Sequence, residues 1–286
     1  MWSIGIYVGN TPFNLRATTR TNNPVLTPQS VSDVDAKFVA DPFMVANGAG
    51  WYMFFEVLNT QGGKGEIGLA TSNNGFDWRY QQIVLTEPFH LSYPYVFEWR
   101  DDYYMVPETL QAGAVCLYKA EEFPTRWSRI GQLIEGSYAD PSIFRFDSRW
   151  WMFACSTPYQ HDTLRLFFAE DLLGPWQEHA ASPIVEGNKC QARPAGRILQ
   201  LGEKIIRFAQ DCVPEYGSQV RAFEITNLTE SSYVERENLN SPILTASGSG
   251  WNAGGMHHVD AHLMANNQWI ACVDGHASAV TETQVR

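Results

Sequence analysis

Two aspartates in this sequence each precede a proline and open a short apolar stretch, at Asp41-Pro42 and Asp140-Pro141. Glu108 closes an aromatic-rich stretch that lies between them. Carboxyl groups held close together in a pocket repel each other, so the pKa of one rises while that of another stays low. Cleavage of a glycosidic bond needs such a pair, one group as acid and the other as base or nucleophile. These residue types therefore point to acid–base chemistry on a sugar.

The Asp-Pro pairs also have a purely structural interpretation. An aspartate before proline often begins a strand or a turn, because its side chain accepts hydrogen bonds from nearby amides. For a single pair that interpretation is the better one. Two pairs at matching positions of a repeat, with Glu108 and Arg193 expected in the same ring, favour a functional site.

The elements that would position these residues belong to an internal repeat. Each copy has an apolar stretch, a turn, an aromatic-rich strand and two further short strands. The copies begin at residues 41, 93, 140, 193 and 258, in steps of 52, 47, 53 and 65 residues. Four short strands per repeat at this spacing are typical of a β-propeller blade, so the sequence predicts five blades.

The fifth copy, which begins at His258, contains only two strands of its own. Ser3–Tyr7 has the pattern of a third strand, and Asn23–Thr27 has that of a closing fourth. We therefore expect residues 1–30 to complete the last blade and to close the ring, which removes exposed sheet edges. The prediction is one all-β domain over residues 1–286, a five-bladed β-propeller with four-stranded blades.

Propeller geometry should bring equivalent repeat positions together at one end of the ring. The first strand of each blade lines the central axis, and the second strand runs back toward the same end. We thus predict a carboxylate-rich funnel with an arginine and several histidines. Its predicted members are Asp41, Tyr93, Asp140, Arg193 and His258 from the first strands, Glu56, Glu108, the pair Gln210-Asp211 and Asp274 from the second strands, and His90 and His257 beside them.

Arg193 and the histidines each leave two interpretations open. Arg193 can hold a substrate carboxylate or hydroxyl, or it can neutralise Asp41 and Asp140. The segment Met256–His262 is rich in histidine, but its spacing matches no strong zinc signature. We expect no firm metal site, and we expect His258 to line the channel and to bind water or an ion.

Composition excludes several classes of partner. The net charge of −11 and the pI near 5.1 give no general attraction to nucleic acids or anionic membranes. No apolar run approaches the roughly 20 residues that span a bilayer, and the first ten residues lack the features of a signal peptide. The 5 cysteines are scattered. We expect a cytoplasmic protein with reduced thiols that binds carbohydrate, without nucleic acid and without a membrane span.

Six segments, spread over nearly all repeats, carry a family resemblance: Ala40–Phe43, Glu66–Ser72, Glu87–Pro94, Val106–Thr109, Ala192–Arg197 and Met256–Asp260. They resemble the N-terminal β-propeller domain of the plant glucosamine inositolphosphorylceramide transferases and its stand-alone bacterial relatives. In the plant proteins a separate transferase domain follows this propeller. The resemblance therefore implies the fold and does not carry transferase activity to this chain.

More distantly, the chain is similar to the five-bladed furanosidases of glycoside hydrolase family 43. In that family an aspartate of the first blade is the general base, and an Asp-Pro of the third blade tunes pKa values and orients the substrate; Asp41 and Asp140 match these positions. The family's acid is usually a glutamate where this chain has Arg193, so Glu108 is our substitute. The resemblance also implies Ca²⁺ or water beside His258, with no cofactor required.

The leading hypothesis is a glycoside hydrolase, similar to arabinofuranosidases and xylosidases, that acts on a furanoside or a related glycan terminus. Asp41 would be base or nucleophile, Glu108 the acid and Asp140 the orienting residue. A non-catalytic glycan-binding propeller is the second hypothesis, and glycosyl transfer or phosphorolysis is the third. The residues expected to bind substrate are Tyr93, His90, Arg193, His257, His258, Glu56 and Asp211.

Overall fold

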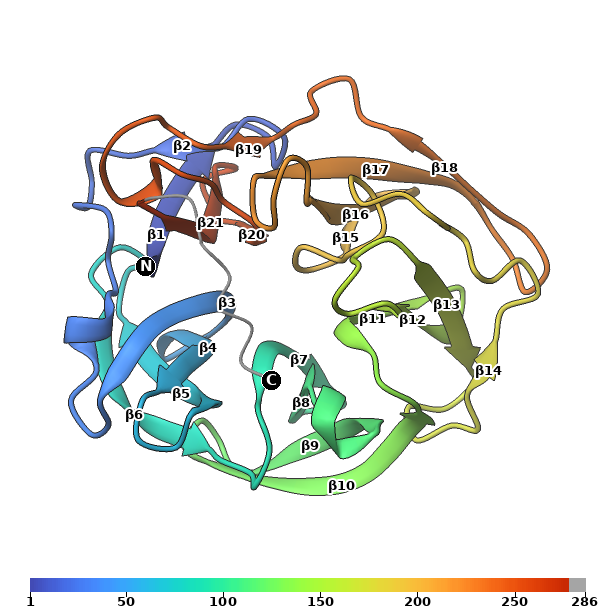
Figure 1. Cartoon of the computed structure of the whole chain (residues 1–286), viewed down its shortest axis with the longest axis horizontal. Coiled ribbons are helices and arrows are strands. Elements are labelled where there is room, and N and C mark those ends of the chain that lie inside the picture. Colours follow the sequence, from blue (N-terminus) through green and yellow to red (C-terminus); the bar gives the residue numbers. More distant parts are fainter. Residues whose placement is uncertain (278–286) are drawn as a thin grey trace.

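The computed structural model describes residues 1–277 and arranges them as five antiparallel sheets around one axis (Figure 1). Each sheet is a blade of four main strands, which confirms the predicted five-bladed propeller. The first blade contains β3 (Ala36–Asn47), β4 (Gly50–Asn59), β5 (Lys64–Ser72) and β6 (Arg79–Leu85). The second contains β7 (Ser92–Trp99), β8 (Asp102–Glu108), β9 (Ala114–Glu122) and β10 (Arg126–Glu135).

The third and fourth blades follow the same order from the axis outward. The third contains β11 (Ala139–Phe146), β12 (Arg149–Cys155), β13 (Leu164–Ala169) and β14 (Gln177–Glu178). The fourth contains β15 (Leu199–Leu201), β16 (Lys204–Asp211), β17 (Gln219–Leu228) and β18 (Tyr233–Glu237), and β19 (Leu244–Thr245) also pairs with β17. Among residues 1–277, the helical elements are short 3₁₀ turns, and none has the length or apolar character needed to cross a membrane.

The fifth blade joins strands from both ends of the chain. Figure 1 shows the N-terminal strand β1 (Trp2–Gly9) beside β21 (Trp269–His276), and the sheet runs from β2 (Arg16–Ala17) through these two to β20 (Val259–Leu263). This confirms that the N-terminal strands complete the last blade.

The closing strand of that blade is not where the sequence placed it. The fourth strand is Arg16–Ala17, and the expected segment Asn23–Thr27 contributes only a bridge between Leu26 and Ile4. Pro24 has no N–H for a ladder. The side chain of Asn23 replaces the backbone hydrogen bonds of a strand there. It accepts the N–H of Ile6 at 2.8 Å and donates to the carbonyl of Ile6 at 2.9 Å.

The recurring tryptophan of the repeat fastens the turn that precedes the outer strand. Trp78, Trp127 and Trp176 donate their Nε1–H groups to backbone carbonyls three or four residues upstream, at 2.9, 3.0 and 3.1 Å. Trp78 and Trp127 are also buried between blades. A buried indole needs such a hydrogen-bond partner, so these residues belong to the core of the fold.

The first strands of three blades share an irregularity that aims residues at one end of the ring. The pairing of β3, β7 and β11 with their neighbours skips two residues, so each Xaa-Pro pair loops out. At these points Asp41, Tyr93 and Asp140 have φ angles of 52°, 46° and 51°. A non-glycine residue in this region costs about 1–3 kcal/mol, and such strain is concentrated at functional sites.

The fourth blade lacks this bulge. Its first strand is confined to β15, and Pro194 forms only an isolated bridge with Ala209. The cause is the close approach of Gly196 to β20, where an added Cβ would lie 1.8 Å from the carbonyl oxygen of Val259. Only glycine fits there, so the segment crosses toward the fifth blade instead of extending its own strand.

Candidate active site

The structure brings the predicted acid, base and orienting residue to one end of the ring. Asp41 and Asp140 come from the bulges of β3 and β11, and Glu108 ends β8. Their relative exposures are only 6%, 1% and 6%. Glu56 on β4 and Asp274 on β21 are buried beside them. We call these five carboxyl groups the carboxylate cluster.

Three members of the carboxylate cluster also hold the bulge of the next blade. The Oε2 of Glu108 accepts the N–H of Asp140 at 3.1 Å, and the Oδ2 of Asp274 accepts the N–H of Asp41 at 2.9 Å. The Oδ2 of Asp41 in turn accepts the N–H of Tyr93 at 3.2 Å. These bonds cross from blade to blade, so the cluster stabilises the strained backbone that presents it.

Arg193 neutralises carboxylates of the cluster, although not the pair proposed from the sequence. Its Nε donates to Oδ2 of Asp140 at 2.6 Å, and its Nη2 lies 3.6 Å from Oε2 of Glu108. Its Nη1 donates to the carbonyl of Pro158 at 2.9 Å. Arg193 acts on Asp41 only through its charge, without a hydrogen bond or ion pair between the two residues. The role of Arg193 in substrate binding stays a prediction. The guanidinium is therefore already committed to Asp140 and Glu108.

Two carboxyl groups of the cluster have raised pKa values. Burial raises the pKa of Glu108 to about 7, and the negative charge of Asp140 adds to the effect. Burial also raises the pKa of Asp41 well above its usual range, and the carboxylates of Asp140, Asp274 and Glu56 act in the same direction. Glu108 can thus exchange a proton near neutral pH, and the raised pKa of Asp41 makes its carboxylate a stronger base than an ordinary aspartate.

His90 lies beside Glu56 at the edge of the cluster. Its Nδ1 accepts the N–H of Gly65 at 2.9 Å, so the ring proton is on Nε2, which lies 3.2 Å from Oε1 of Glu56. Burial acts to lower the pKa of His90, but the charge of Glu56, its hydrogen bond to the imidazole and the charge of Glu108 together outweigh burial, and the pKa is raised. His90 therefore sits within the predicted site and is half-buried at its edge.

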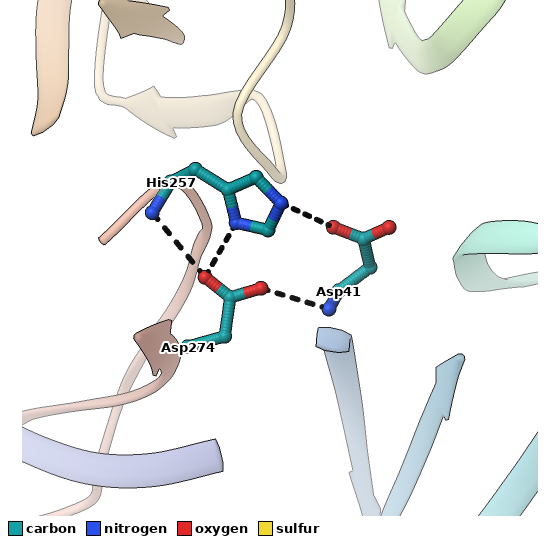
Figure 2. Close-up of side chains that lie close together, drawn as sticks. All are labelled: Asp41, His257 and Asp274. Atoms are coloured by element: carbon teal, nitrogen blue, oxygen red, sulfur yellow. Dashed lines mark hydrogen bonds and ion pairs between the residues drawn. The ribbon is translucent and has the colours of Figure 1, made fainter. Parts of the chain in front are cut away.

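His257 links Asp274 to Asp41, as Figure 2 shows. Its Nδ1–H donates to Oδ1 of Asp274 at 2.7 Å, and its Nε2 faces Oδ1 of Asp41 at 3.7 Å. Burial acts to raise the pKa of Asp274, but His257 outweighs it and the pKa is lowered. The indole of Trp2 stacks on the imidazole with 4.0 Å between ring centroids. Trp2 was missed in the sequence because only the pairing of β1 with β21 brings it there.

The fourth blade contributes Gln210 to the site in place of Asp211. Gln210 donates from Nε2 to Oδ2 of Asp140 at 2.8 Å. Asp211 is instead held by Gln219 at 2.6 Å and by Arg221 at 2.8 Å. Adjacent residues of a strand point to opposite faces, so only one of the two can face the cluster. Asp211 is therefore not brought together with the other predicted residues.

Tyr93 and His258 lie deeper, along the axis of the ring. The hydroxyl oxygen of Tyr93 accepts the N–H of Gly196 at 2.6 Å and lies 2.8 Å from Oγ of Ser142. The ring of His258 packs edge-on against Phe43 and Tyr93, with centroids 4.6 and 5.3 Å apart. Both side chains are fully buried. Burial lowers the pKa of His258 to about 4, so its imidazole is neutral.

The surroundings of His258 do not fit Ca²⁺, the ion implied by the family-43 resemblance. Calcium takes about six to eight oxygen ligands. The carboxylate oxygen that faces His258 is Oδ1 of Asp41, 3.9 Å from Nδ1. Both oxygens of Asp274 are engaged, one by the amide of Asp41 and the other by His257. The donors here are mainly imidazole nitrogens, which calcium does not prefer.

Comparison with known proteins identifies the family. The model of a family described as glucosamine inositolphosphorylceramide transferase 1, N-terminal, matches residues 1–276. The chain belongs to this family. Relatives named glucosamine inositolphosphorylceramide transferase 1 from Oryza sativa subsp. japonica and Arabidopsis thaliana are 34% and 32% identical to it, each over 96% of this chain. The chain spans only 40% and 39% of the length of these two relatives.

Solved structures with a similar fold include several glycoside hydrolases. The catalytic domain of a family-62 α-L-arabinofuranosidase from Coprinopsis cinerea has a TM-score of 0.64 at 11% identity and covers 90% of this chain and 97% of its own. A mutant α-L-arabinanase from Cellvibrio cellulosa has a TM-score of 0.58 at 20% identity, with coverages of 82% and 85%. A family-117 glycoside hydrolase from Zobellia galactanivorans has a TM-score of 0.57 at 12% identity, with coverages of 85% and 86%. At these identities the likeness shows the fold alone.

Proposed function

We propose that this protein hydrolyses a glycosidic bond at a furanoside or a related glycan terminus. Glu108 is the acid, Asp41 is the base or nucleophile, and Asp140 orients the two. The observation that supports the proposal is the raised pKa of Glu108, about 7, next to a second carboxyl group in the same buried cluster. An acid that acts near neutral pH must still hold its proton there.

The hydrogen bonds of Glu108 indicate which of its oxygens carries that proton. Oε2 accepts the amide of Asp140 and approaches Arg193, so it is an acceptor in both contacts. The proton is therefore on Oε1, from which it passes to the leaving glycosidic oxygen as the bond to the anomeric carbon breaks.

Asp41 has one oxygen available for the second half of the reaction. Its Oδ2 accepts the amide of Tyr93, while the nearest ion-pair partner of Oδ1 is Nε2 of His257 at 3.7 Å. The raised pKa of Asp41 makes it a good proton acceptor once it is ionised. Oδ1 either takes a proton from the water that attacks the anomeric carbon, or attacks that carbon itself before water releases the sugar.

A second candidate function is glycan binding without chemistry. It is favoured by the structural use of the same carboxylates, since Glu108 and Asp274 hold backbone amides of the next blade. It is also consistent with Arg193 at the position where the distant glycosidases have their acid. In that case the strained bulges present a polar surface to a sugar, and substitution of Asp41 changes affinity only modestly.

The test is a turnover screen on chromogenic furanosides and pyranosides, with and without phosphate. We expect wild-type protein to release the chromophore, and Asp41→Asn and Glu108→Gln to lower the rate by about 10²–10⁴-fold. Asp211→Asn is the matched control, because this buried carboxylate lies on the same strand end but bonds to Arg221 and Gln219. Its rate should stay near that of the wild type.

The outcomes separate the candidates. Sugar binding without release by the wild type would refute hydrolysis and favour the binding module. Release that requires phosphate would indicate phosphorolysis. If hydrolysis occurs, its rate should fall as the pH rises through about 7, because Glu108 then loses the proton that it must donate.

A further inference from the structure

Two loops of neighbouring blades meet at the edge of the carboxylate cluster. The loop 156–163 joins β12 to β13 and carries His161, and the loop 212–218 joins β16 to β17 and carries Tyr216. The centroids of their two rings lie 5.1 Å apart, and both side chains are half-buried. Neither residue was predicted from the sequence, because both lie in connections between strands, where the copies of the repeat share no pattern.

The ring of Tyr216 contacts a neighbour of each of the two carboxyl groups proposed to do the chemistry. The guanidinium of Arg193, which is close to Glu108, lies over this ring with 5.0 Å between Cζ and the ring centroid. The imidazole of His257, which faces Asp41, lies edge-on to it with centroids 5.1 Å apart. Tyr216 therefore lies beside both halves of the candidate active site.

Each of the two side chains has a polar group without a partner. Nδ1 of His161 accepts Nη1–H of Arg193 at 2.8 Å. Burial and the charge of Arg193 lower the pKa of His161 to about 4, so the imidazole is neutral and its proton is on Nε2. Burial raises the pKa of Tyr216 well above its usual range, so its hydroxyl keeps the proton. Within residues 1–277, neither this hydroxyl nor Nε2 of His161 has a hydrogen-bond partner.

The backbone beside Tyr216 is fixed by close packing. Gly217 has a φ of 77°, and an added Cβ there would lie 2.5 Å from the indole of Trp2. Only glycine therefore lets the loop rest on this indole. Within the loop, Oγ of Ser218 donates to the carbonyl of Glu215 at 2.7 Å. A ring that is already held in place loses little conformational entropy when a ligand binds to it.

The charges around the two loops favour an uncharged ligand. The cationic side chains beside the cluster are already paired, Arg193 with Asp140 and Glu108, and His90 with Glu56. An anionic ligand would find no free positive charge there and would be repelled by the carboxylates. The two groups without a partner are a neutral N–H and a neutral hydroxyl. Sugar hydroxyls, which both donate and accept hydrogen bonds, can satisfy both of them.

We propose that His161 and Tyr216 bind hydroxyl groups of an uncharged sugar and determine which sugar the site accepts. Nε2–H of His161 donates to one hydroxyl, and the phenol of Tyr216 bonds to another. A site that pairs with particular hydroxyls rejects analogues without them, because its own polar groups are then left unpaired. The inference rests on the proposed function in either of its forms, since a hydrolase and a binding module would use the same contacts.

The experiment compares wild type with Tyr216→Phe and His161→Asn. Tyr216→Phe keeps the ring over Arg193 and removes only the hydroxyl. His161→Asn keeps an acceptor for Arg193 and removes Nε2–H, and asparagine tolerates the φ of 60° at this position. Calorimetry gives the affinity for methyl α-L-arabinofuranoside, methyl β-D-xyloside, methyl β-D-glucoside and methyl β-D-glucuronide. Each variant should weaken binding of the preferred uncharged glycoside by about 3–10-fold, and should raise KM for its chromogenic counterpart with little change in kcat.

Tyr159→Phe is the matched control, because Tyr159 lies in the same loop as His161 but is 73% exposed. Its affinity should equal that of the wild type. The glucuronide should bind at least about 10-fold more weakly than the preferred uncharged glycoside. A deoxy form of that glycoside, without the hydroxyl that Tyr216 contacts, should bind equally to wild type and Tyr216→Phe.

Three results would overturn the proposal: no binding of any of these glycosides to wild type, tightest binding of the glucuronide, or unchanged affinity in both folded variants. The proposed hydrolysis can fail separately. Turnover with an unchanged KM in both variants would refute only the role of His161 and Tyr216. Binding that depends on these two residues, without any turnover, would refute only the hydrolysis.

Discussion

Asp41 and Asp260 are both buried aspartates on first strands of neighbouring blades, yet their pKa values shift in opposite directions. Asp260 accepts Nε–H of Arg197 at 2.6 Å, and it lies 3.0 Å from Nε2 of His262. Burial acts to raise the pKa of Asp260, but Arg197 outweighs it and holds the pKa well below its usual range. Asp41 has carboxylates as neighbours instead, and its pKa is raised well above that range.

The comparison shows that burial alone does not separate a functional carboxylate from a structural one. What differs is whether a positively charged side chain neutralises the buried carboxylate. Arg197 also donates from Nη2 to the carbonyls of Met44 and Val96, at 3.1 and 2.9 Å, so its ion pair with Asp260 is joined to the first strands of two further blades. Asp41 has a free oxygen and a surplus of negative charge around it. The first arrangement stabilises the ring, and the second is suited to exchanging protons.

The largest effect should come from removing Arg197, the positively charged partner of Asp260. Arg197→Met removes the guanidinium from a buried carboxylate and leaves it only His262, and we expect it to lower the free energy of unfolding by about 3–5 kcal/mol, measured by urea denaturation. The double variant Arg197→Met/Asp260→Asn should recover part of this loss. Asp41→Asn should not destabilise the fold comparably. Equal losses for Arg197→Met and Asp41→Asn would contradict the distinction between the two aspartates.

A smaller effect should appear in how stability depends on pH. The pKa of Glu108 is about 7 in the folded protein, above the ordinary value of 4.5. Between these values the folded state holds a proton that the unfolded chain releases. The stability that protonated Glu108 contributes to the folded state is therefore fully present at low pH and is lost as the pH rises through about 7. We expect wild type to lose roughly 2 kcal/mol relative to Glu108→Gln between pH 5 and pH 8. Parallel pH profiles for the two proteins would argue against the raised pKa.

The smallest effect concerns Tyr93, which the sequence assigned to substrate binding. Its hydroxyl bonds to Gly196 and Ser142, and its side chain has 0% exposure. Tyr93→Phe should therefore lower the free energy of unfolding by about 1 kcal/mol, since the amide of Gly196 loses its acceptor. The KM for any substrate found in the screen should not change. A large rise in KM without loss of stability would instead place the phenol in contact with substrate.

The sequence predicted the ring and most of the carboxylate cluster for the same reason. The four strands of a blade are close together in the sequence, so the blades appear there as a repeat. The symmetry of the ring then brings residues at equal positions of the repeat close together in space. Asp41, Glu108 and Asp140 meet on that basis alone.

The remaining features depend on information that the repeat does not contain. The choice between Gln210 and Asp211 depends on which face of β16 each occupies. The position of Trp2 follows from the register of β1 against β21, where it pairs with His276. The ion pair of Arg197 with Asp260 was not predicted, because Gly196 lies against β20 and the fourth blade does not follow the strand pattern of the others. Only the folded chain shows Arg197 reaching Asp260.

The pairing of β1 with β21 also sets the order in which the site can come into being during synthesis. The ribosome produces Asp41 early, whereas His257 and Asp274 appear more than 200 residues later. Until then the first four blades have an unclosed edge and unshielded apolar faces, which are liabilities for a growing chain. Contacts this distant in sequence also form slowly. The emergence of the last strand is thus the event that closes the propeller and the one that completes the carboxylate cluster.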